Sequence, residues 1–260
     1  MILNALSVIL VLTVNYTSQV FKFNDTTIAE MSDKYDNLFT PAGYAFSIWG
    51  LIFLNLIIYS FYQAKRTFFS TKESDFVLQT GSWFFITNLL NAVWVIAFTY
   101  DFTALSVIIM FGILFCLIQI IICTNMECWD APIGIIAGVW WPICLYAGWI
   151  SVATVANVAT LLVKIHWNGW GISPEYWTKL MIVVIIILNL YLLVTRNLRE
   201  FLMVSVWALV AIYIRHRTTV DEIAWTALLT AILLFIAAGI HGYQNQDTSP
   251  VKKFKEWKKG

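Results

Sequence analysis

The sequence predicts an all-α membrane protein with about eight transmembrane helices. Of its 260 residues, 60% are hydrophobic and only 12% are charged, and the mean hydropathy is +0.76. Soluble domains are nearer half apolar and a quarter charged, and a soluble globule could not bury this much apolar surface. The chain also contains charge-free stretches of about the length that a bilayer core of roughly 30 Å requires. The natural solvent of this chain is therefore lipid.

The predicted spans are charge-free segments bounded by charged or turn-forming residues. They are residues 1–21, 37–64, 76–100, 102–126, 131–163, 180–195, 201–214 and 223–240. The first has no Lys or Arg before it and no Ala-x-Ala-like cleavage site, so we expect a retained helix rather than a signal peptide. We expect the second helix to begin at Gly43 and Pro142 to bend the fifth.

The seventh span is short, and the orientation of the chain depends on it. Its 14 residues rise about 21 Å, so it either crosses with Glu200 and Arg215 reaching the interface, or is re-entrant or interfacial. If it crosses, ten Lys and Arg residues, Lys72 among them, lie on the N-terminal side and six lie opposite. The positive-inside rule then places both ends in the cytoplasm. If it does not cross, the N-terminus is expected outside.

The C-terminal tail, residues 246–260, is basic and is expected in the cytoplasm in either topology. It either rests on anionic lipid headgroups or serves only to set the orientation. A bacterial inner or plasma membrane is the expected location.

Several classes of function are disfavoured by what the sequence omits. The net charge of +1 gives no basis for nucleic-acid binding. The four cysteines (Cys116, Cys123, Cys128 and Cys144) form no CxxC pair, so neither a metal site nor a redox dithiol is expected. The cores of the spans hold no Asp, Glu, Lys, Arg or His, which argues against ion-coupled transport and against acid–base catalysis.

Three spans instead carry faces of indole and amide side chains. The spacings of three and four residues keep each set on one helical face. The sets are Phe46, Trp49 and Phe53 in the second span, Trp83, Thr87, Asn91 and Trp94 in the third, and Trp141, Leu145, Trp149, Ala153 and Asn157 in the fifth. These faces indicate either helix packing with Asn side chains linking the helices, or an aromatic pocket for a planar ligand.

Three segments in order resemble the TspO/MBR family, which contains bacterial tryptophan-rich sensory proteins and the mitochondrial translocator protein, or peripheral benzodiazepine receptor. They are LFTPAGYAFSIWGLIF (38–53), NLLNAVWVIAF (88–98) and LYAGWISVATVAN (145–157). The sequence departs from the family pattern at Ile48, Thr87 and Leu145, where the family has Pro, Gln and Pro. The resemblance covers residues 1–163, whereas residues 164–245 would add three helices that the five-helix members lack.

The resemblance implies a five-helix bundle, commonly a homodimer, whose pocket opens toward the loop at residues 22–42. Family members bind porphyrins, haem-related tetrapyrroles and sterols, so a porphyrin or haem is an expected ligand and no cofactor is required. The implied ligand-binding residues are Pro41, Phe46, Trp49, Phe53, Thr87, Asn91, Trp94, Trp149, Ala153 and Asn157.

Three functions follow as hypotheses. The first is a membrane binding or sensory protein for a planar hydrophobic molecule, with loop 22–42 as a lid whose carboxylates or backbone amides meet the ligand's polar rim. The second is a porphyrin-degrading enzyme that uses Trp49 and Trp149, as some bacterial relatives are reported to do. The third is a scaffold or transporter in which the aromatic faces serve only for packing.

Overall fold

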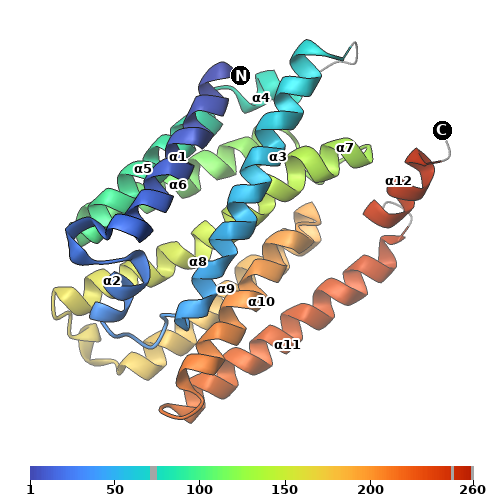
Figure 1. Cartoon of the computed structure of the whole chain (residues 1–260). Coiled ribbons are helices and arrows are strands. Elements are labelled where there is room, and N and C mark those ends of the chain that lie inside the picture. Colours follow the sequence, from blue (N-terminus) through green and yellow to red (C-terminus); the bar gives the residue numbers. More distant parts are fainter. Residues whose placement is uncertain (71–74, 247–248, 259–260) are drawn as a thin grey trace.

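The computed structural model describes residues 1–70, 75–246 and 249–258, and these contain helices and connections but no strand (Figure 1). Lys72 of the charge count, and residues 247–248 and 259–260 of the tail, lie outside the described residues. The long helices are α1 (Ile2–Phe21), α3 (Ile48–Phe68), α5 (Trp83–Thr99), α6 (Thr103–Cys123), α8 (Trp141–Lys164), α9 (Pro174–Arg196), α10 (Arg199–His216) and α11 (Asp221–Gln244). The short helices are α2 (Ile28–Lys34), α4 (Asp75–Thr80), α7 (Ile133–Ile135) and α12 (Pro250–Trp257), with 3-10 turns η1 (Phe23–Asp25), η2 (Gly43–Ser47) and η4 (Gly169–Gly171).

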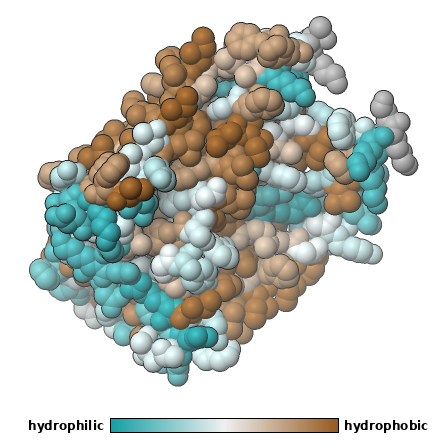
Figure 2. Space-filling view, in the orientation of Figure 1, coloured by the Kyte–Doolittle hydropathy of each residue, from teal (hydrophilic) through white to brown (hydrophobic). Residues whose placement is uncertain are grey.

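The all-α membrane fold is confirmed. Six helices in the described part of the chain are long and apolar enough to cross a membrane; they cover Ile2–Phe21, Gly43–Phe68, Thr103–Cys123, Ile133–Lys164, Pro174–Arg196 and Asp221–Gln244. The helix α5 is apolar but has only 17 residues. Figure 2 shows apolar side chains across the middle of the bundle, with hydrophilic ones gathered at the lower left, where α2 and the α8–α9 connection lie.

The seventh predicted span is the helix α10, and it runs the length of its neighbours. Its 18 residues rise about 27 Å, and it contacts α8, α9 and α11. The two residues before it and the four after it form tight reversals, so α9, α10 and α11 are antiparallel (Figure 1). The N-terminus and α12 therefore lie at the same end of the bundle.

Two predicted spans are less regular than expected. The third is divided at Gly81, whose φ of +53° ends α4 and starts a separate α5. The fifth contains a π-helical turn, η3 (Ile136–Trp140), which ends two residues before Pro142. The wider turn accommodates a residue that lacks an N–H and whose ring would clash with an α-helical carbonyl one turn earlier.

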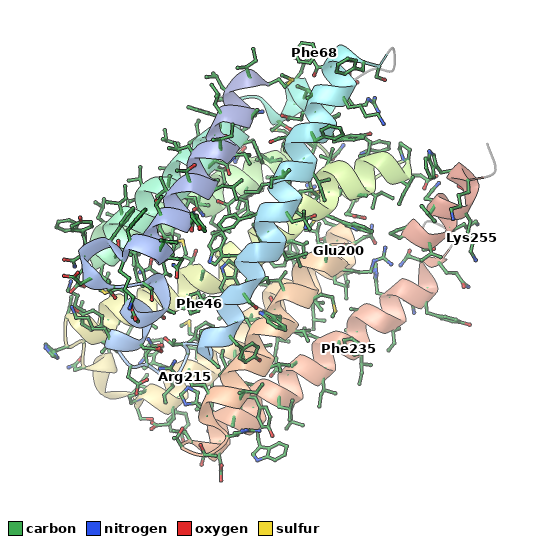
Figure 3. All side chains as sticks on the ribbon, viewed as in Figure 1. Phe46, Phe68, Glu200, Arg215, Phe235 and Lys255 are labelled. Atoms are coloured by element: carbon green, nitrogen blue, oxygen red, sulfur yellow. The ribbon has the colours of Figure 1, made fainter. Side chains whose placement is uncertain are left out.

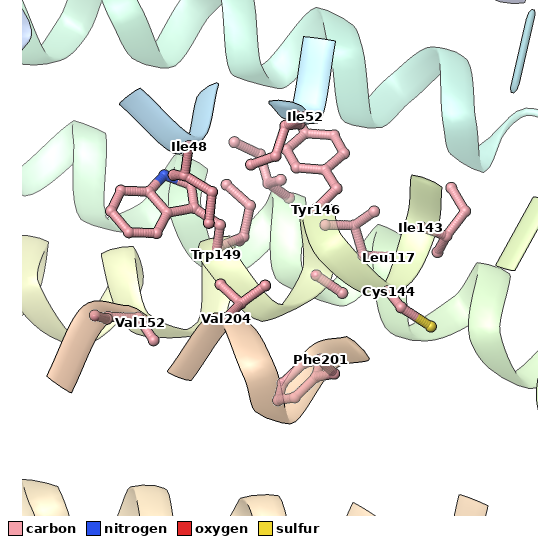
Figure 4. Packing of buried hydrophobic residues seen from close by; sticks show 14 of the residues in the cluster. Ile48, Ile52, Leu117, Ile143, Cys144, Tyr146, Trp149, Val152, Phe201 and Val204 are labelled. Carbon is pink, nitrogen blue, oxygen red and sulfur yellow. The ribbon is translucent and has the colours of Figure 1, made fainter. Parts of the chain in front are cut away.

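The additional helices pack against the first five to form one bundle. The helix α8 contacts α3, α6 and α10, and its side chains fill the centre (Figure 4). The closest approach is at Gly148, where an added Cβ would lie 2.9 Å from the backbone oxygen of Phe201 and 3.0 Å from Cβ of Val204. Small residues at such crossings let two helix backbones approach in lipid.

Amide and hydroxyl side chains link the helices inside the bundle. Asn4 donates to Gln63 (3.1 Å), Asn15 donates to Asn91 (3.1 Å) and Asn189 donates to Ser205 (3.0 Å). Each bond joins two helices and satisfies polar groups that lipid cannot.

Candidate functional site

A small cavity lies beneath α2, between α3, α5 and α8. Its lining includes seven of the ten ligand-binding residues expected from the sequence. These seven are Pro41, Phe46, Trp49, Trp94, Trp149, Ala153 and Asn157. Three faces from separate spans therefore meet at one place, and the loop before α3 contributes Pro41.

The aromatic rings of this site pack on one another. Trp149 meets Trp49 edge-to-face with centroids 6.5 Å apart, and meets Phe46 at 6.0 Å. Trp49 also stacks on Phe53 at 5.3 Å, and Trp94 stacks on Phe98 at 5.1 Å. These are the offset and edge-to-face arrangements that aromatic quadrupoles favour.

The space left between the rings is about 30 Å³, which equals one water molecule's share of liquid volume. In this conformation the site is closed, and a porphyrin or a sterol enters only if the lid and the aromatic faces separate. The closed packing is the arrangement that the scaffold hypothesis expects.

The three indole N–H groups of the cavity differ in their partners. Trp94 donates from Nε1 to Oδ1 of Asn157 at 2.9 Å, and Asn157 in turn donates to Ser106 at 3.0 Å. By contrast, Nε1 of Trp49 and Nε1 of Trp149 are buried and have no acceptor among the described residues. Trp149 is only 2% exposed and Trp49 only 7%. Two buried donors therefore remain unsatisfied at the cavity.

Three expected residues do not line the cavity. Phe53 supports Trp49 by stacking, as above. Thr87 donates to the backbone oxygen of Trp83 within its own helix (2.8 Å). Asn91 accepts a hydrogen bond from Asn15 and so joins α5 to α1.

Sequence reasoning missed other lining residues. These are Ile28, Ser32, Phe98, Val152, Ala156 and Thr160. Ala156 and Thr160 continue the Trp149 face at helical spacing, and Phe98 follows Trp94 by one turn, so this signal was in the sequence. Ile28 and Ser32 come from α2, in a segment that was expected to be a loop.

The lid, residues 22–42, contains the short helix α2, which has a defined start. Thr27 accepts from the backbone N–H of Glu30 (3.2 Å), and Glu30 accepts from the backbone N–H of Thr27 (2.8 Å). This reciprocal capping box explains why TIAE starts a helix here. Glu30 also pairs with Lys22 at 2.6 Å, so this carboxylate is engaged within the lid itself.

Asp101, in the turn between α5 and α6, fastens the C-terminal end of α2. Its carboxylate accepts hydrogen bonds from Lys34 (2.8 Å) and Tyr35 (2.8 Å) of the lid, and from Lys164 (2.7 Å) at the end of α8. Partial burial alone would raise the pKa of Asp101, but the bonds from Lys164, Lys34 and Tyr35 outweigh it and lower the pKa to about 2. The carboxylate therefore stays ionised and keeps both lysines in place.

The other fastening comes from α10. Arg215 donates to Asp33 (2.6 Å) and to Asp36 (3.1 Å), and Figure 3 shows it on α10 near the lid end of the bundle. The backbone N–H of Ala42 also donates to the oxygen of Ala211 (3.1 Å), and Trp207 donates to the oxygen of Ala45 (3.1 Å). The added helix α10 thus holds the segment that leads into α3, and Asp33 and Asp36 face Arg215 instead of an incoming ligand.

Comparison with known proteins adds one finding. Residues 1–240 match the family model described as TSPO-like protein. No curated protein and no solved structure matches the chain. The matched region continues through α9 and α10 and includes most of α11, so the helices after residue 163 lie within it. Because the match covers nearly the whole sequence, the chain belongs to the TSPO-like protein family.

Proposed function

We propose that this protein binds a planar, hydrophobic small molecule, a porphyrin or a sterol-like compound, at the tryptophan cavity beneath α2, as a membrane receptor or sensor. The observation that supports this is the pair of buried indole donors without acceptors, Trp49 and Trp149. A ligand with an apolar face and a carbonyl, carboxylate or hydroxyl oxygen would stack on the rings and accept from the indoles.

The energetics favour a ligand with such an acceptor. A buried donor without a partner costs about 1–3 kcal/mol. In the same cavity the indole of Trp94 has Asn157 as its acceptor, whereas the indoles of Trp49 and Trp149 have none. A purely structural cluster gains nothing from leaving the other two indoles unpaired, whereas a ligand site recovers that cost on binding.

Ligand entry requires the lid to move. The closed cavity of about 30 Å³ is far smaller than the several hundred Å³ that a drug-sized ligand occupies. The lid is held mainly by ion pairs of Asp33, Lys34 and Asp36 at the C-terminal end of α2, and partly exposed pairs contribute only about 0–1 kcal/mol each. A ligand that buries large aromatic surfaces supplies enough free energy to displace them.

In this proposal the protein lies in a plasma membrane with both termini in the cytoplasm. With α10 crossing, the Lys and Arg count favours the end that carries the termini. The tryptophan cavity and its lid then lie near the outer surface. A homodimer remains an expectation from the family resemblance.

The test is a porphyrin titration of the purified full-length protein in nanodiscs, followed by the porphyrin absorbance shift and by tryptophan quenching. The variant Trp49→Phe/Trp149→Phe keeps aromatic bulk but removes both unpaired donors. Two lost hydrogen bonds of about 0.5–1.5 kcal/mol each predict about a tenfold weaker affinity. The control Trp225→Phe changes a half-exposed indole on α11 and is expected to bind like wild type.

Unchanged affinity and quenching in the double variant would remove the tryptophan cavity as the binding site. Absence of porphyrin and sterol binding by the wild type would leave the scaffold hypothesis. Loss of porphyrin absorbance under illumination in the wild type, but not in the double variant, would favour the enzymatic hypothesis.

A further inference from the structure

A second and larger cavity lies at the other end of the bundle, near the termini. Its volume is about 270 Å³, room for roughly nine water molecules. The connection between α6 and α7, the start of α10 and the end of α11 enclose it. Its lining includes Glu127, Trp129, Asp130, Trp140, Asn197 and Arg199.

One acidic and one basic side chain, Glu127 and Arg199, line this cavity without pairing with each other. Among the described residues, Glu127 and Arg199 have no side-chain hydrogen bond and no ion pair within 4 Å. Nε of Arg199 is also buried without a partner. An acid and a base that share a cavity but stay apart leave a gap that a ligand with two separated charges would bridge.

The surroundings hold these groups in position. Asn197 donates to the backbone oxygen of Glu127 (2.9 Å), which fixes the α6–α7 connection against the start of α10. Glu127 itself has a φ of +59°, an uncommon conformation for a residue with a Cβ. Trp129 and Trp140 form one wall, edge-to-face with centroids 5.5 Å apart. Indole faces attract organic cations.

The electrostatics of Glu127 suit a cationic partner. Burial, together with the charge of the nearby Glu200, raises the pKa of Glu127 to about 8, and Arg199 opposes this rise. At pH 7 and without a ligand, this carboxyl is therefore mostly protonated. An ammonium group placed beside it would lower its pKa and release a proton.

Arg199 offers the complementary half of the site. It occupies the first turn of α10, where the helix dipole also favours an anion. The guanidinium group binds phosphate and carboxylate oxygens in a fork geometry. The end of the neighbouring tail helix α12 lies over the cavity, because Lys253 pairs with Asp130 at 2.6 Å and Pro250 belongs to the lining.

We propose that this cavity binds a zwitterion of the phosphoethanolamine type, with its phosphate on Arg199 and its ammonium group between Glu127 and the Trp129–Trp140 wall. The ligand is either a free phosphoethanolamine or the headgroup of a phospholipid, since the cavity lies at the end of the membrane-spanning helices. The site is separate from the tryptophan cavity and does not depend on the function proposed for it.

The experiment uses the full chain and two probes. Calorimetric titration of phosphoethanolamine into detergent-purified protein is run at pH 7 in two buffers of different ionisation enthalpy, which reports proton release. Native mass spectrometry then compares retained phosphatidylethanolamine with phosphatidylglycerol. The variants are Glu127→Gln and Arg199→Gln, and the control is Lys179→Gln, an ion-paired lysine at the opposite end.

Saturable binding of the free zwitterion with a net release of protons supports the proposal and identifies a soluble ligand. We expect each variant to weaken binding about tenfold or more, Glu127→Gln to abolish the proton release, and Lys179→Gln to change neither. Selective retention of phosphatidylethanolamine without binding of the free probe, lost in both variants, supports the proposal with a lipid ligand.

Two results would overturn it. One is that the wild type binds neither phosphoethanolamine nor phosphatidylethanolamine in preference to phosphatidylglycerol. The other is that both variants bind as the wild type does. The wild-type measurements decide the first outcome even if a variant fails to fold.

Discussion

The contact between α8 and α10 at Gly148 gives the sharpest mutational prediction. It joins the part of the chain that resembles the five-helix family to the helices that follow it. The variant Gly148→Ala adds one methyl group at 2.9 Å from the backbone oxygen of Phe201 and 3.0 Å from Cβ of Val204. Since a backbone atom cannot rotate away as a side chain does, the two helices must move apart.

The magnitude follows from two opposing effects. Overpacking of a closely packed contact costs about 1–3 kcal/mol. Replacing Gly by Ala inside a helix recovers up to about 1 kcal/mol of helix propensity. The matched control is Gly50→Ala in α3, where nothing lies within 4 Å of the added Cβ, so only the gain remains. We therefore expect Gly148→Ala to be about 1–3 kcal/mol less stable than Gly50→Ala.

The assay is reversible unfolding in mixed micelles, with the free energy of unfolding extrapolated to zero denaturing detergent. Both variants are compared with wild type under the same lipid and detergent conditions. Equal stabilities of the two variants, within about 0.5 kcal/mol, would refute the close docking of α10 on α8. The lid contacts of α10 would then lose their structural basis as well.

Three other predictions concern the lid and the cavity. Arg215→Gln removes the ion pairs with Asp33 and Asp36, so porphyrin association in stopped-flow measurements should be several-fold faster, with a stability loss under about 1 kcal/mol. The control Lys179→Gln should leave the association rate unchanged, and equal rates for both variants would refute the role of Arg215 in holding the lid. Asn157→Leu leaves the indole of Trp94 unpaired and should lower the free energy of unfolding by about 1–3 kcal/mol in the same assay. A change near zero would contradict the role of this hydrogen bond. The pKa of Asp101 is lowered to about 2 from 3.8, so ionised Asp101 contributes its full stabilisation of the folded protein above about pH 4 and loses it as the pH falls toward 2. The free energy of unfolding of Asp101→Asn, measured against pH, should lack this decrease.

Much of the fold was predictable because helices that span a membrane need long charge-free stretches of sequence. Charge-free length located the helices, and the spacing of Trp49, Trp94 and Trp149 indicated that three faces meet. The short segment that became α10 was ambiguous by length alone. Its place beside α8, α9 and α11 follows from packing, which no local pattern reveals.

The polar details were less predictable because they depend on how each helix is rotated. Asn91 and Asn157 looked equivalent in sequence, yet one joins α1 to α5 and the other accepts from Trp94. The ion pair between Arg215 and Asp33 joins residues 182 positions apart and has no local signature. The lid helix does have a local signature, the capping box of Thr27 and Glu30.

The most direct test of the proposed function is photo-crosslinking of a diazirine-bearing porphyrin to the protein in nanodiscs, with the labelled peptides mapped by mass spectrometry. The proposal predicts labels in the segments around residues 41–53, 94–98 and 149–160, competed by unlabelled porphyrin and reduced in Trp49→Phe/Trp149→Phe. Labels confined to the lipid-facing surfaces of α9 and α11, or labelling that unlabelled porphyrin does not compete, would contradict it.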